Sequence, residues 1–591
     1  MKELLYPFDS SFILTNKRKL KRLLLSNGEQ RIKKRIALLG GSTTGNIKQI
    51  LELFLLNYGI EPVFYESEYN QYYQDALFPR DELVSFNPDF VYVFTTVRNI
   101  RCFPNLSDKP ESIKQMMKKE MDRYYEIWQS IRDNFCCPVL QNNFELPVYR
   151  LLGNKDASDI HGAVNYISRL NQMMCEYIDS QDGVYIVDIN YISADFGLGK
   201  WHDLFNWYMY KYAMHMEAIP YVCFNVANII KSILGKNKKG FVLDLDNTLW
   251  GGVIGDDGND GIKIGQEEAT GQAYYDFQQF LKHHYNLGVL LSVDTKNCYE
   301  NAIEGLNNPN CVLKPEDFVV IKSNWESKEK NFEEIADEIG VLPESLVFID
   351  DNPAERYIVS EQFPNVSVPE INNVQDYIKT IDRSGFFETT LLSDDDKTRN
   401  QMYKDNVSRE QLKKRFSDYK DYLLDLNMEA VISSFSADVY DRVSQLANKS
   451  NQYNLTTKRY TKEQIERISN DNDYITLYGC LKDRFGDNGL VSVVIGHIEK
   501  EVVSIELWVM SCRVLRRDLE YAMMDCFINE CDNKRVNRIV GYYYPTSKNR
   551  LVKDFYRMMG FVCAQEDPDG NTVWELAISE YETKNKVIHV K

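Results

Sequence analysis

The sequence has little that would mark a secreted, zinc-binding or membrane protein. Its twelve cysteines are scattered, and no two have the C-x-x-C spacing of a zinc site. Reduced thiols of this kind favour a cytoplasmic location. No apolar run is long enough to span a membrane, and the first basic cluster follows the initial apolar residues, unlike that of a signal peptide. We therefore expect a cytoplasmic protein without membrane insertion.

An excess of basic residues is also missing. The chain has 69 lysines and arginines against 87 aspartates and glutamates, a formal net charge of −18. Nucleic acid is therefore not expected as a partner, because binding to a phosphate backbone requires positive charge. With 591 residues the chain is long enough for several domains, each with its own core.

The stretch at 241–252 reads FVLDLDNTLWGG, a short apolar run that ends in Asp244 and Asp246. Such a run predicts a buried parallel strand, and chemistry in α/β sheets takes place beyond the carboxyl ends of such strands. Two adjacent acids repel each other unless a cation lies between them, and Mg²⁺ prefers carboxylate oxygens. We expect both to bind Mg²⁺, with Asp244 as nucleophile and Asp246 as general acid and base. The alternative is an acidic turn that caps the next helix.

Three segments further along complete this pattern. A second apolar strand ends in the hydroxyl of Thr295, which is suited to hold a phosphoryl oxygen. Lys328 is a point cation that can balance the charge of the transferred group. A third apolar strand ends in Asp350 and Asp351, two more candidate metal ligands. Together these residues predict Mg²⁺-dependent phosphoryl chemistry.

This order of strand ends resembles the haloacid dehalogenase (HAD) phosphatase superfamily over about residues 239–370. The segments DLDNTLWGGVIGDDG, TKN, NWESKEKN and FIDDNPAER resemble one branch of it, the FkbH-like family. The resemblance implies an enzyme that dephosphorylates a three-carbon acyl phosphate, 1,3-bisphosphoglycerate, and loads the glyceryl group onto the phosphopantetheine of an acyl carrier protein. The substrate-binding residues that it implies are Thr248, Gly251, Gly252, Lys296 and Asn297.

One position departs from the family pattern. FkbH-like sequences commonly read Cys-Ser-Lys-Asn after the second strand, and the cysteine is the expected acyl carrier. Here the stretch is Asp294-Thr295-Lys296-Asn297, and a carboxylate cannot hold a thioester. Cys298 is a candidate substitute. The other outcomes are direct transfer from the acyl phosphate to the carrier thiol, or a reaction other than glyceryl loading.

Other functional classes stay open. One is a HAD phosphatase or acyl-modifying enzyme that acts on a free small phosphate in polysaccharide or secondary-metabolite biosynthesis. Another is a non-enzymatic scaffold with degenerate sites, which the complete set of HAD-like segments disfavours.

Residues 1–236 are expected to form an SGNH hydrolase-like or flavodoxin-like α/β domain, because strands alternate with helical stretches. Gly-Gly-Ser after the first strand, with Ser42, resembles the SGNH nucleophile block, and Asn99 corresponds to the oxyanion asparagine. No Asp-x-x-His block with the right spacing follows, and a serine without a base is a poor nucleophile. We expect a degenerate, silent domain, with an active esterase as the alternative.

Residues 237–390 are expected to form the HAD-like Rossmannoid domain, with an irregular flap at 251–265 and helices at 266–284 and 328–338. Residues 391–591 are expected to be α+β, beginning with an exposed connecting helix within 393–425. Further elements are expected as strands at 430–435, 474–481, 489–498, 502–509 and 538–544, and as helices at 518–531 and 548–559.

The ending DFYRMMGF, with Tyr556, resembles that of GNAT acetyltransferases. Proteins of that fold hold the CoA pyrophosphate on backbone amides of an R-x-x-G-x-G/A loop. Here Arg516 and Asp518 occupy both glycine positions, so acetyl-CoA is a doubtful cofactor. Arg513, Arg516 and Arg517 are candidate ligands for the phosphate of a carrier's phosphopantetheine. The alternative is an acidic first turn that stabilises its own helix.

Overall fold

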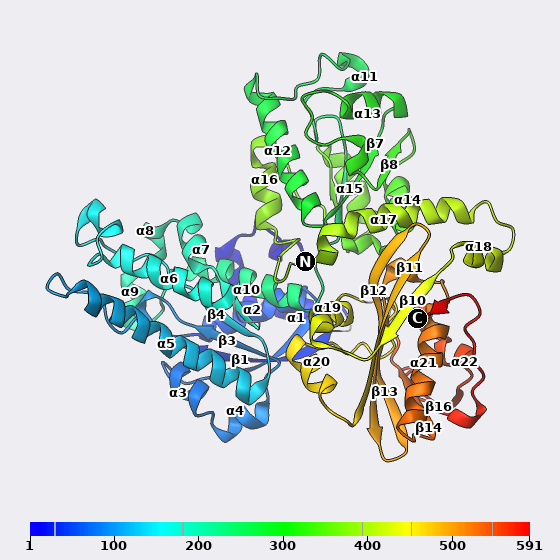
Figure 1. The fold of residues 1–591 in the computed structure, drawn as a ribbon. Coiled ribbons are helices and arrows are strands. Elements are labelled where there is room, and N and C mark those ends of the chain that lie inside the picture. Colours follow the sequence, from blue (N-terminus) through cyan, green and yellow to red (C-terminus); the bar gives the residue numbers. More distant parts are fainter. Residues whose placement is uncertain (29–30, 180–182, 393, 451, 547) are drawn as a thin grey trace. The chain divides into compact units, whose positions relative to one another are not determined.

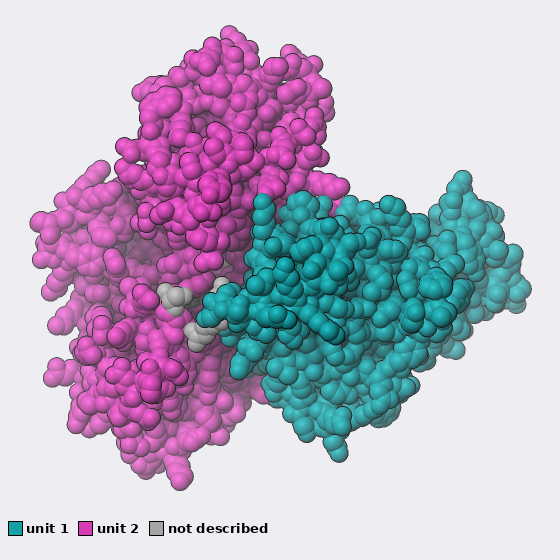
Figure 2. All heavy atoms as spheres, turned by 180° about the vertical axis from the view of Figure 1, so that it is seen from behind, with its two compact units in different colours: residues 1–233, 461–464 teal, residues 234–460, 465–591 magenta. Residues whose placement is uncertain are grey.

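The computed structural model describes residues 1–28, 31–179, 183–392, 394–450, 452–546 and 548–591 (Figure 1). The chain divides into two compact units, Met1–Ile233 with Thr461–Gln464, and Leu234–Tyr460 with Ile465–Lys591 (Figure 2). Helices and three β-sheets give the mixed, multidomain α/β architecture that the sequence predicts. The boundaries expected at 236 and 390 stay predictions.

The first unit contains a five-stranded parallel sheet of order β2-β1-β3-β4-β5. Its strands are β1 Ile32–Gly40, β2 Ile60–Glu66, β3 Phe90–Phe94, β4 Val139–Asn142 and β5 Val184–Val187. Its helices are α1 Ser10–Ser26, α2 Gly45–Asn57, α3 Tyr72–Leu77, α4 Asp81–Phe86, α5 Pro110–Phe135, α6 Ala163–Asp179, α7 Ile189–Phe196, α8 Leu198–Trp201, α9 Leu204–Tyr210 and α10 Ile219–Ile233. One core joins α5 to the sheet, with Trp128 packed among Val91 and Val93. The short strand β4 was not predicted.

The second unit begins with a four-stranded parallel sheet of order β8-β7-β6-β9. Its strands are β6 Gly240–Leu243, β7 Leu290–Thr295, β8 Val320–Ser323 and β9 Leu346–Ile349. Its helices are α11 Ile254–Asp257, α12 Ala269–Asn286, α13 Tyr299–Leu306, α14 Lys328–Ile339, α15 Pro353–Gln362 and α16 Val374–Arg383. Alternate strand residues point to opposite faces, so Phe241 and Leu243 join one core while Val242 joins the other. Two apolar faces explain why these strands read as continuous hydrophobic runs.

The same unit contains an eight-stranded sheet of order β15-β16-β14-β13-β12-β11-β10-β17. Its strands are β10 Glu429–Ser433, β11 Tyr474–Asp483, β12 Gly486–Glu499, β13 Val502–Met510, β14 Arg538–Tyr543, β15 Val562–Glu566, β16 Thr572–Ala577 and β17 His589–Val590. Most neighbours are antiparallel, but β13 pairs with β14 in parallel. The remaining helices are α17 Asp394–Lys413, α18 Tyr419–Asp425, α19 Tyr440–Lys449, α20 Lys462–Ser469, α21 Leu519–Asn533 and α22 Phe555–Met559.

Two expectations for this part of the chain were wrong. The connecting helix α17 is not simply exposed, because Met402, Tyr403 and Arg409 are buried; Ser393, the first residue of the expected segment, lies outside the described residues. The helix expected at 548–559 is α-helical only from Phe555. The Asn549 side chain instead donates to the backbone carbonyls of Asn454 and Tyr544, and Arg550–Val552 form a short 3-10 helix. Among the described helices, none combines the length and apolar character needed to cross a membrane.

Candidate phosphoryl-transfer site

Three parallel strands bring acidic residues to one edge of the β6 sheet. Leu243 at the end of β6 lies level with Val293 of β7 and Ile349 of β9. The next residue along each strand direction is an aspartate, namely Asp244, Asp294 and Asp350. The in-register pairing therefore places three carboxyl groups in one row, which the sequence alone only suggested.

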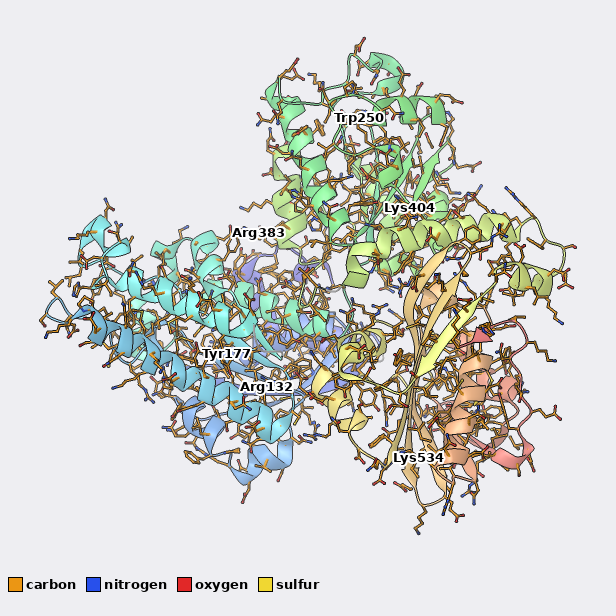
Figure 3. All side chains as sticks on the ribbon, viewed as in Figure 1. Arg132, Tyr177, Trp250, Arg383, Lys404 and Lys534 are labelled. Carbon is orange, nitrogen blue, oxygen red and sulfur yellow. The ribbon has the colours of Figure 1, made fainter. Side chains whose placement is uncertain are left out.

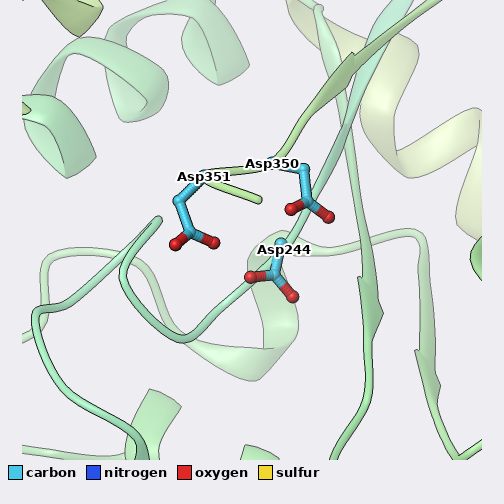
Figure 4. A group of neighbouring side chains, drawn as sticks. All are labelled: Asp244, Asp350 and Asp351. Carbon is cyan, nitrogen blue, oxygen red and sulfur yellow. The ribbon is translucent and has the colours of Figure 1, made fainter. Parts of the chain in front are cut away.

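Asp244, Asp350 and Asp351 form the tightest acidic group of the described chain. One carboxylate oxygen of each lies within 4.8 Å of the other two (Figure 4). Burial, together with the negative charge of Asp244, raises the pKa of Asp350 to about 6 and also raises the pKa of Asp351. The Thr248 hydroxyl connects the group, because it donates to Asp244 and accepts from the Asp351 N–H at 3.1 Å. Three hard oxygen donors this close suit a divalent cation such as Mg²⁺.

Lys328 is a cation that the protein itself contributes to the acidic group. Its Nζ donates to Asp244 Oδ1 at 2.6 Å and to Asp350 Oδ2 at 2.5 Å. Burial disfavours the charged ammonium, but the two carboxylates outweigh that effect and keep the pKa of Lys328 above its ordinary value. Lys328 is the first residue of α14, so the helix start positions the charge against the strand ends.

Asp246 does not belong to the acidic group, and its expected role as a metal ligand stays a prediction. Its Oδ1 accepts from Trp250 Nε1 at 2.9 Å and from the Ile254 N–H at 3.1 Å, and its Oδ2 accepts from Asn297 Nδ2 at 2.7 Å. Trp250 is fully buried among the side chains beside the sheet (Figure 3). Burial raises the pKa of Asp246, which favours the protonated form that a general acid needs.

The two glycines of the flap shape its backbone. Gly252 has φ +95°, and a Cβ there would lie 2.5 Å from a carboxylate oxygen of Asp257. Gly251 exchanges two backbone hydrogen bonds with Lys263, which closes the stem of the flap. The flap contains one helical turn, α11, although it was expected to be irregular throughout. A substrate-binding role for Gly251 and Gly252 stays a prediction.

The remaining residues of this edge lie around the acids. Thr295 is buried at the end of β7, and the partly exposed Lys296 forms an ion pair with Glu355 at 2.6 Å. Asp294 is fully buried, accepts from Asn331 Nδ2 at 3.0 Å, and burial raises its pKa to about 8. Sequence analysis missed Asn331. Its position three residues after Lys328, on the same helix face, was the available signal.

The SGNH-like residues lie in the first unit, and the described residues show no base beside the serine. Asn99 Nδ2 donates to the Gly41 carbonyl at 2.9 Å, so Asn99 contacts the segment that carries Ser42. No imidazole of the described residues hydrogen-bonds to Ser42; His202 instead contacts the Leu146 carbonyl through Nε2 at 2.9 Å. This geometry matches a serine without an activating partner.

The arginine loop before α21 differs from the expectation that three arginines face a ligand. Arg517 is buried and donates to Asp483 at 3.0 Å, and Arg513 is buried with its Nε 3.2 Å from Ser511 Oγ. Arg516 alone is exposed. Arg516 and Asp518 have φ values of +62° and +61°. The loop therefore has the left-handed backbone conformation that favours glycine, although both positions carry side chains.

Tyr556 is also buried, with its hydroxyl 3.4 Å from the Tyr542 carbonyl. Gly541 makes this packing possible, because a Cβ at that position would collide with the Tyr556 ring. The described geometry therefore ties Tyr556 into the core beside β14.

Comparisons with known proteins match parts of the chain. Residues 35–231 match the family described as FkbH, N-terminal domain. The chain is similar to the N-terminal part of the protein BF1531 from Bacteroides fragilis, which contains a phosphatase domain and was solved with Mg. The two share 27% identity at a TM-score of 0.58, over 63% of this chain and 98% of that one. No curated protein matches this chain in sequence.

Weaker structural matches are with acetyltransferases. The ribosomal-protein-S18-alanine N-acetyltransferase from Escherichia coli matches at 13% identity and a TM-score of 0.21, over 27% of this chain and 99% of that one. Ard1 from Thermoplasma volcanium matches at 18% identity and a TM-score of 0.20, over 25% of this chain and 97% of that one. The α+β character of the eight-stranded sheet follows from its own strand order.

Proposed function

Because this chain is an FkbH-like protein of the HAD superfamily, we propose that it dephosphorylates a three-carbon acyl phosphate and loads the glyceryl group onto an acyl carrier protein. The family match and the phosphatase neighbour support a HAD-type phosphatase. The observation that carries the proposal is the acidic group of Asp244, Asp350 and Asp351 with Lys328 bound to two of its members.

The acidic group fits Mg²⁺. Its donors are all carboxylate oxygens, they lie within 4.8 Å of one another, and the structural neighbour from Bacteroides fragilis was solved with Mg. Asp244, Asp350 and Asp351 would hold the ion, which supplies positive charge for the phosphoryl oxygens.

The protein's own residues account for the phosphoryl steps. Asp244 forms a bond to phosphorus while the bond to the leaving oxygen breaks, and Asp246 gives its proton to that oxygen. Asp246 then takes a proton from water, which attacks the aspartyl phosphate, releases inorganic phosphate and restores Asp244. Lys328, already within hydrogen-bond distance of Asp244, stabilises the charge that develops on phosphorus.

The acyl step in this proposal is direct transfer from the acyl phosphate to the carrier thiol. Asp294 fills the position where an acyl-carrying cysteine is expected, and it is fully buried and bound to Asn331. Cys298 is exposed and precedes α13, outside the row of strand-end carboxyl groups. On the carrier side, the exposed Arg516 is the arginine of its loop that is available to a phosphopantetheine phosphate.

The second candidate is a phosphatase for a free small phosphate in polysaccharide or secondary-metabolite biosynthesis. The observation that favours it is the same buried Asp294, since the site offers no thiol at that position. This candidate requires neither a carrier protein nor phosphopantetheine.

Mass spectrometry of a carrier protein separates the two candidates. A phosphopantetheinylated carrier is incubated with the enzyme, Mg²⁺ and 1,3-bisphosphoglycerate, while released phosphate is measured in parallel. A glyceryl mass on the carrier supports the first candidate. Phosphate release from small phosphates with an unmodified carrier supports the second, and no phosphate release with any substrate would refute both. EDTA should stop the release, and added Mg²⁺ should restore it.

A further inference from the structure

A second group of polar side chains lies in the first unit, at the point where successive strands begin to be added to the opposite side of β1. The strand order places the topological switch point between β1 and β3. Ligands of doubly wound sheets bind beyond the carboxyl ends of the strands at such a point. The segment after β1 leads through Ser42 into α2, and the segment after β3 contains Arg98 and Asn99. The phosphoryl chemistry proposed above uses none of these residues.

Residues of the segment after β3 contact the residue before Ser42. The Asn99 side chain holds the carbonyl of Gly41, the residue before Ser42, and a Cβ at Gly41 would collide with that amide. Next to Asn99, Arg98 stacks on the indole of Trp207, with its guanidinium carbon 4.8 Å from the ring centroid. Packing therefore fixes Asn99 and Arg98 in the segment after β3, and Arg98 is the cation of this segment.

Lys211, directly after α9, contacts the residue after Ser42. Lys211 lies over the same Trp207 ring, with Nζ 5.3 Å from its centroid. The Lys211 carbonyl accepts from the N–H of Thr43, the residue after Ser42, at 3.1 Å. Trp207 thus connects two cations, and the contacts form a closed series that passes through the backbone of Ser42. We call its other members the switch-point ring (Gly41, Thr43, Arg98, Asn99, Trp207 and Lys211).

Ser42 itself has an unfilled hydrogen-bonding capacity. It is 2% exposed, and its Oγ has no hydrogen-bond partner among the described residues. A buried polar group left in this state is destabilising, and a ligand or water that hydrogen-bonds to it would explain the unpaired hydroxyl. Ser42 also precedes α2 by three residues, and α2 begins without a side-chain cap. Uncapped N-terminal amides favour an anion.

The charges around the ring favour a strongly negative ligand. Neither Arg98 nor Lys211 forms an ion pair within the described parts of the chain, and both are partly exposed. Two acids lie nearby. Burial raises the pKa of Glu145, near Arg98, to about 7, and Glu66 forms an ion pair with Lys48. Glu66 also accepts from Thr44 Oγ1 at 2.7 Å, so the carboxylate nearest to the helix start is already bound to Lys48 and Thr44.

We propose that the switch-point ring binds the phosphate group of a small metabolite, with Ser42, the start of α2, Arg98 and Lys211 as its ligands. Phosphate carries more negative charge than a carboxylate and offers more acceptor oxygens, which matches two cations, a hydroxyl and backbone amides. Trp207 holds both cations through its indole ring. The site binds and has no hydrolytic role, since Ser42 lacks a base.

Calorimetric titration of the full chain with inorganic phosphate tests the proposal. It is done in EDTA at constant ionic strength, with chloride as the balancing anion. Arg98→Ala and Lys211→Ala should each weaken the affinity by about tenfold or more, as expected for the loss of a charge-assisted contact. The matched control Lys200→Ala removes an exposed lysine of the same unit and should leave the affinity unchanged. Phosphate release at the β6 site with Mg²⁺ should stay at the wild-type rate in all three variants.

A fluorescence titration of the wild-type chain covers the case in which a variant fails to fold. Phosphate should change the emission of the wild type and leave that of Trp207→Phe unaltered. Equal phosphate affinity in the wild type, Arg98→Ala and Lys211→Ala would overturn the proposal. Acetate binding as tightly as phosphate would also overturn it, because the ring would then not distinguish a phosphate group.

Discussion

Lys328 Nζ lies 2.6 Å from Asp244 Oδ1, which joins the first residue of α14 to the residue after β6 across 84 positions of sequence. The contact places a cation against the residue proposed as nucleophile before any substrate is present. It holds the Asp244 side chain in one orientation, which is the geometry that attack on phosphorus requires.

The first prediction concerns this nucleophile. Asp244→Asn should abolish phosphate release, because an amide cannot form the aspartyl phosphate. The assay is the release of inorganic phosphate from 1,3-bisphosphoglycerate or small phosphate esters, with circular dichroism to confirm folding. Asp260→Asn, a change in the exposed part of the flap, is the control and should keep wild-type activity. A fully active Asp244→Asn protein would refute the assignment.

The second prediction concerns Asp246. Asp246→Asn should lower kcat by about 10²–10⁴-fold, as expected for the loss of general acid and base catalysis. Because Trp250, Ile254 and Asn297 donate to this carboxylate, part of the loss could instead come from a displaced flap. Asn297→Ala removes one donor while keeping the acid and should cost less than Asp246→Asn. Equal losses in both variants would indicate that Asp246 acts only by holding the flap.

The third prediction concerns the carrier arm. Acetyl-CoA should bind weakly or not at all, because side chains occupy both glycine positions of the loop before α21. A carrier protein should bind more tightly with its phosphopantetheine than without it, and Arg516→Ala should reduce that difference. Arg557→Ala, an exposed arginine of α22, serves as the control. Calorimetry that finds tight acetyl-CoA binding would contradict this prediction.

The fourth prediction concerns the acyl group. Acid quenching after mixing with radiolabelled bisphosphoglycerate, without carrier, should leave no stable hydroxylamine-sensitive label on Asp294, because an acyl anhydride there would hydrolyse. A thioester mapped to Cys298 and lost in Cys298→Ala would show instead that an exposed thiol carries the acyl group. The exposed Cys563→Ala variant controls for nonspecific labelling.

The fifth prediction concerns pH and stability. Burial raises the pKa of Glu520 from 4.5 to about 7, so the folded chain binds a proton that the unfolded chain releases between those values. The unfolding free energy should therefore fall as pH rises from about 4.5 to about 7, by on the order of 3 kcal/mol, and then level off. Glu520→Gln should remove this component and raise Tm most at pH 8. Glu499→Gln, at a side chain that is 82% exposed, should leave the profile unchanged.

The phosphoryl-transfer site was largely predictable because its residues follow apolar strands directly. Asp244, Thr295 and Asp350 end or follow such runs, and parallel strands bring their ends together. The direction of the Asp246 carboxylate was not predictable, because it depends on the indole of Trp250 and on Asn297, which reach it only after the flap has folded.

The arginine loop illustrates a second limit. A sequence shows that Arg513 and Arg517 are basic, but Arg517 is buried against Asp483, 34 residues earlier in the chain, and Arg513 against Met402 of α17. The short strands β4 and β17 were missed for a related reason, since strands of four and two residues give little periodicity and form by pairing with longer neighbours.

The two sheets of the second unit share one helix. Tyr403 of α17 is buried in the core that contains Val242 and Phe348, and Arg409, two turns further on, binds Asp483 of β11 with a bidentate pair at 2.9 and 2.8 Å. A chain divided near residue 391 would keep Arg409 and Asp483 together but would remove Tyr403 from the core of the β6 sheet, which would leave that core partly open. The junction near residue 391 is therefore a poor place to divide this chain, because the β6 sheet depends on α17 for part of its core.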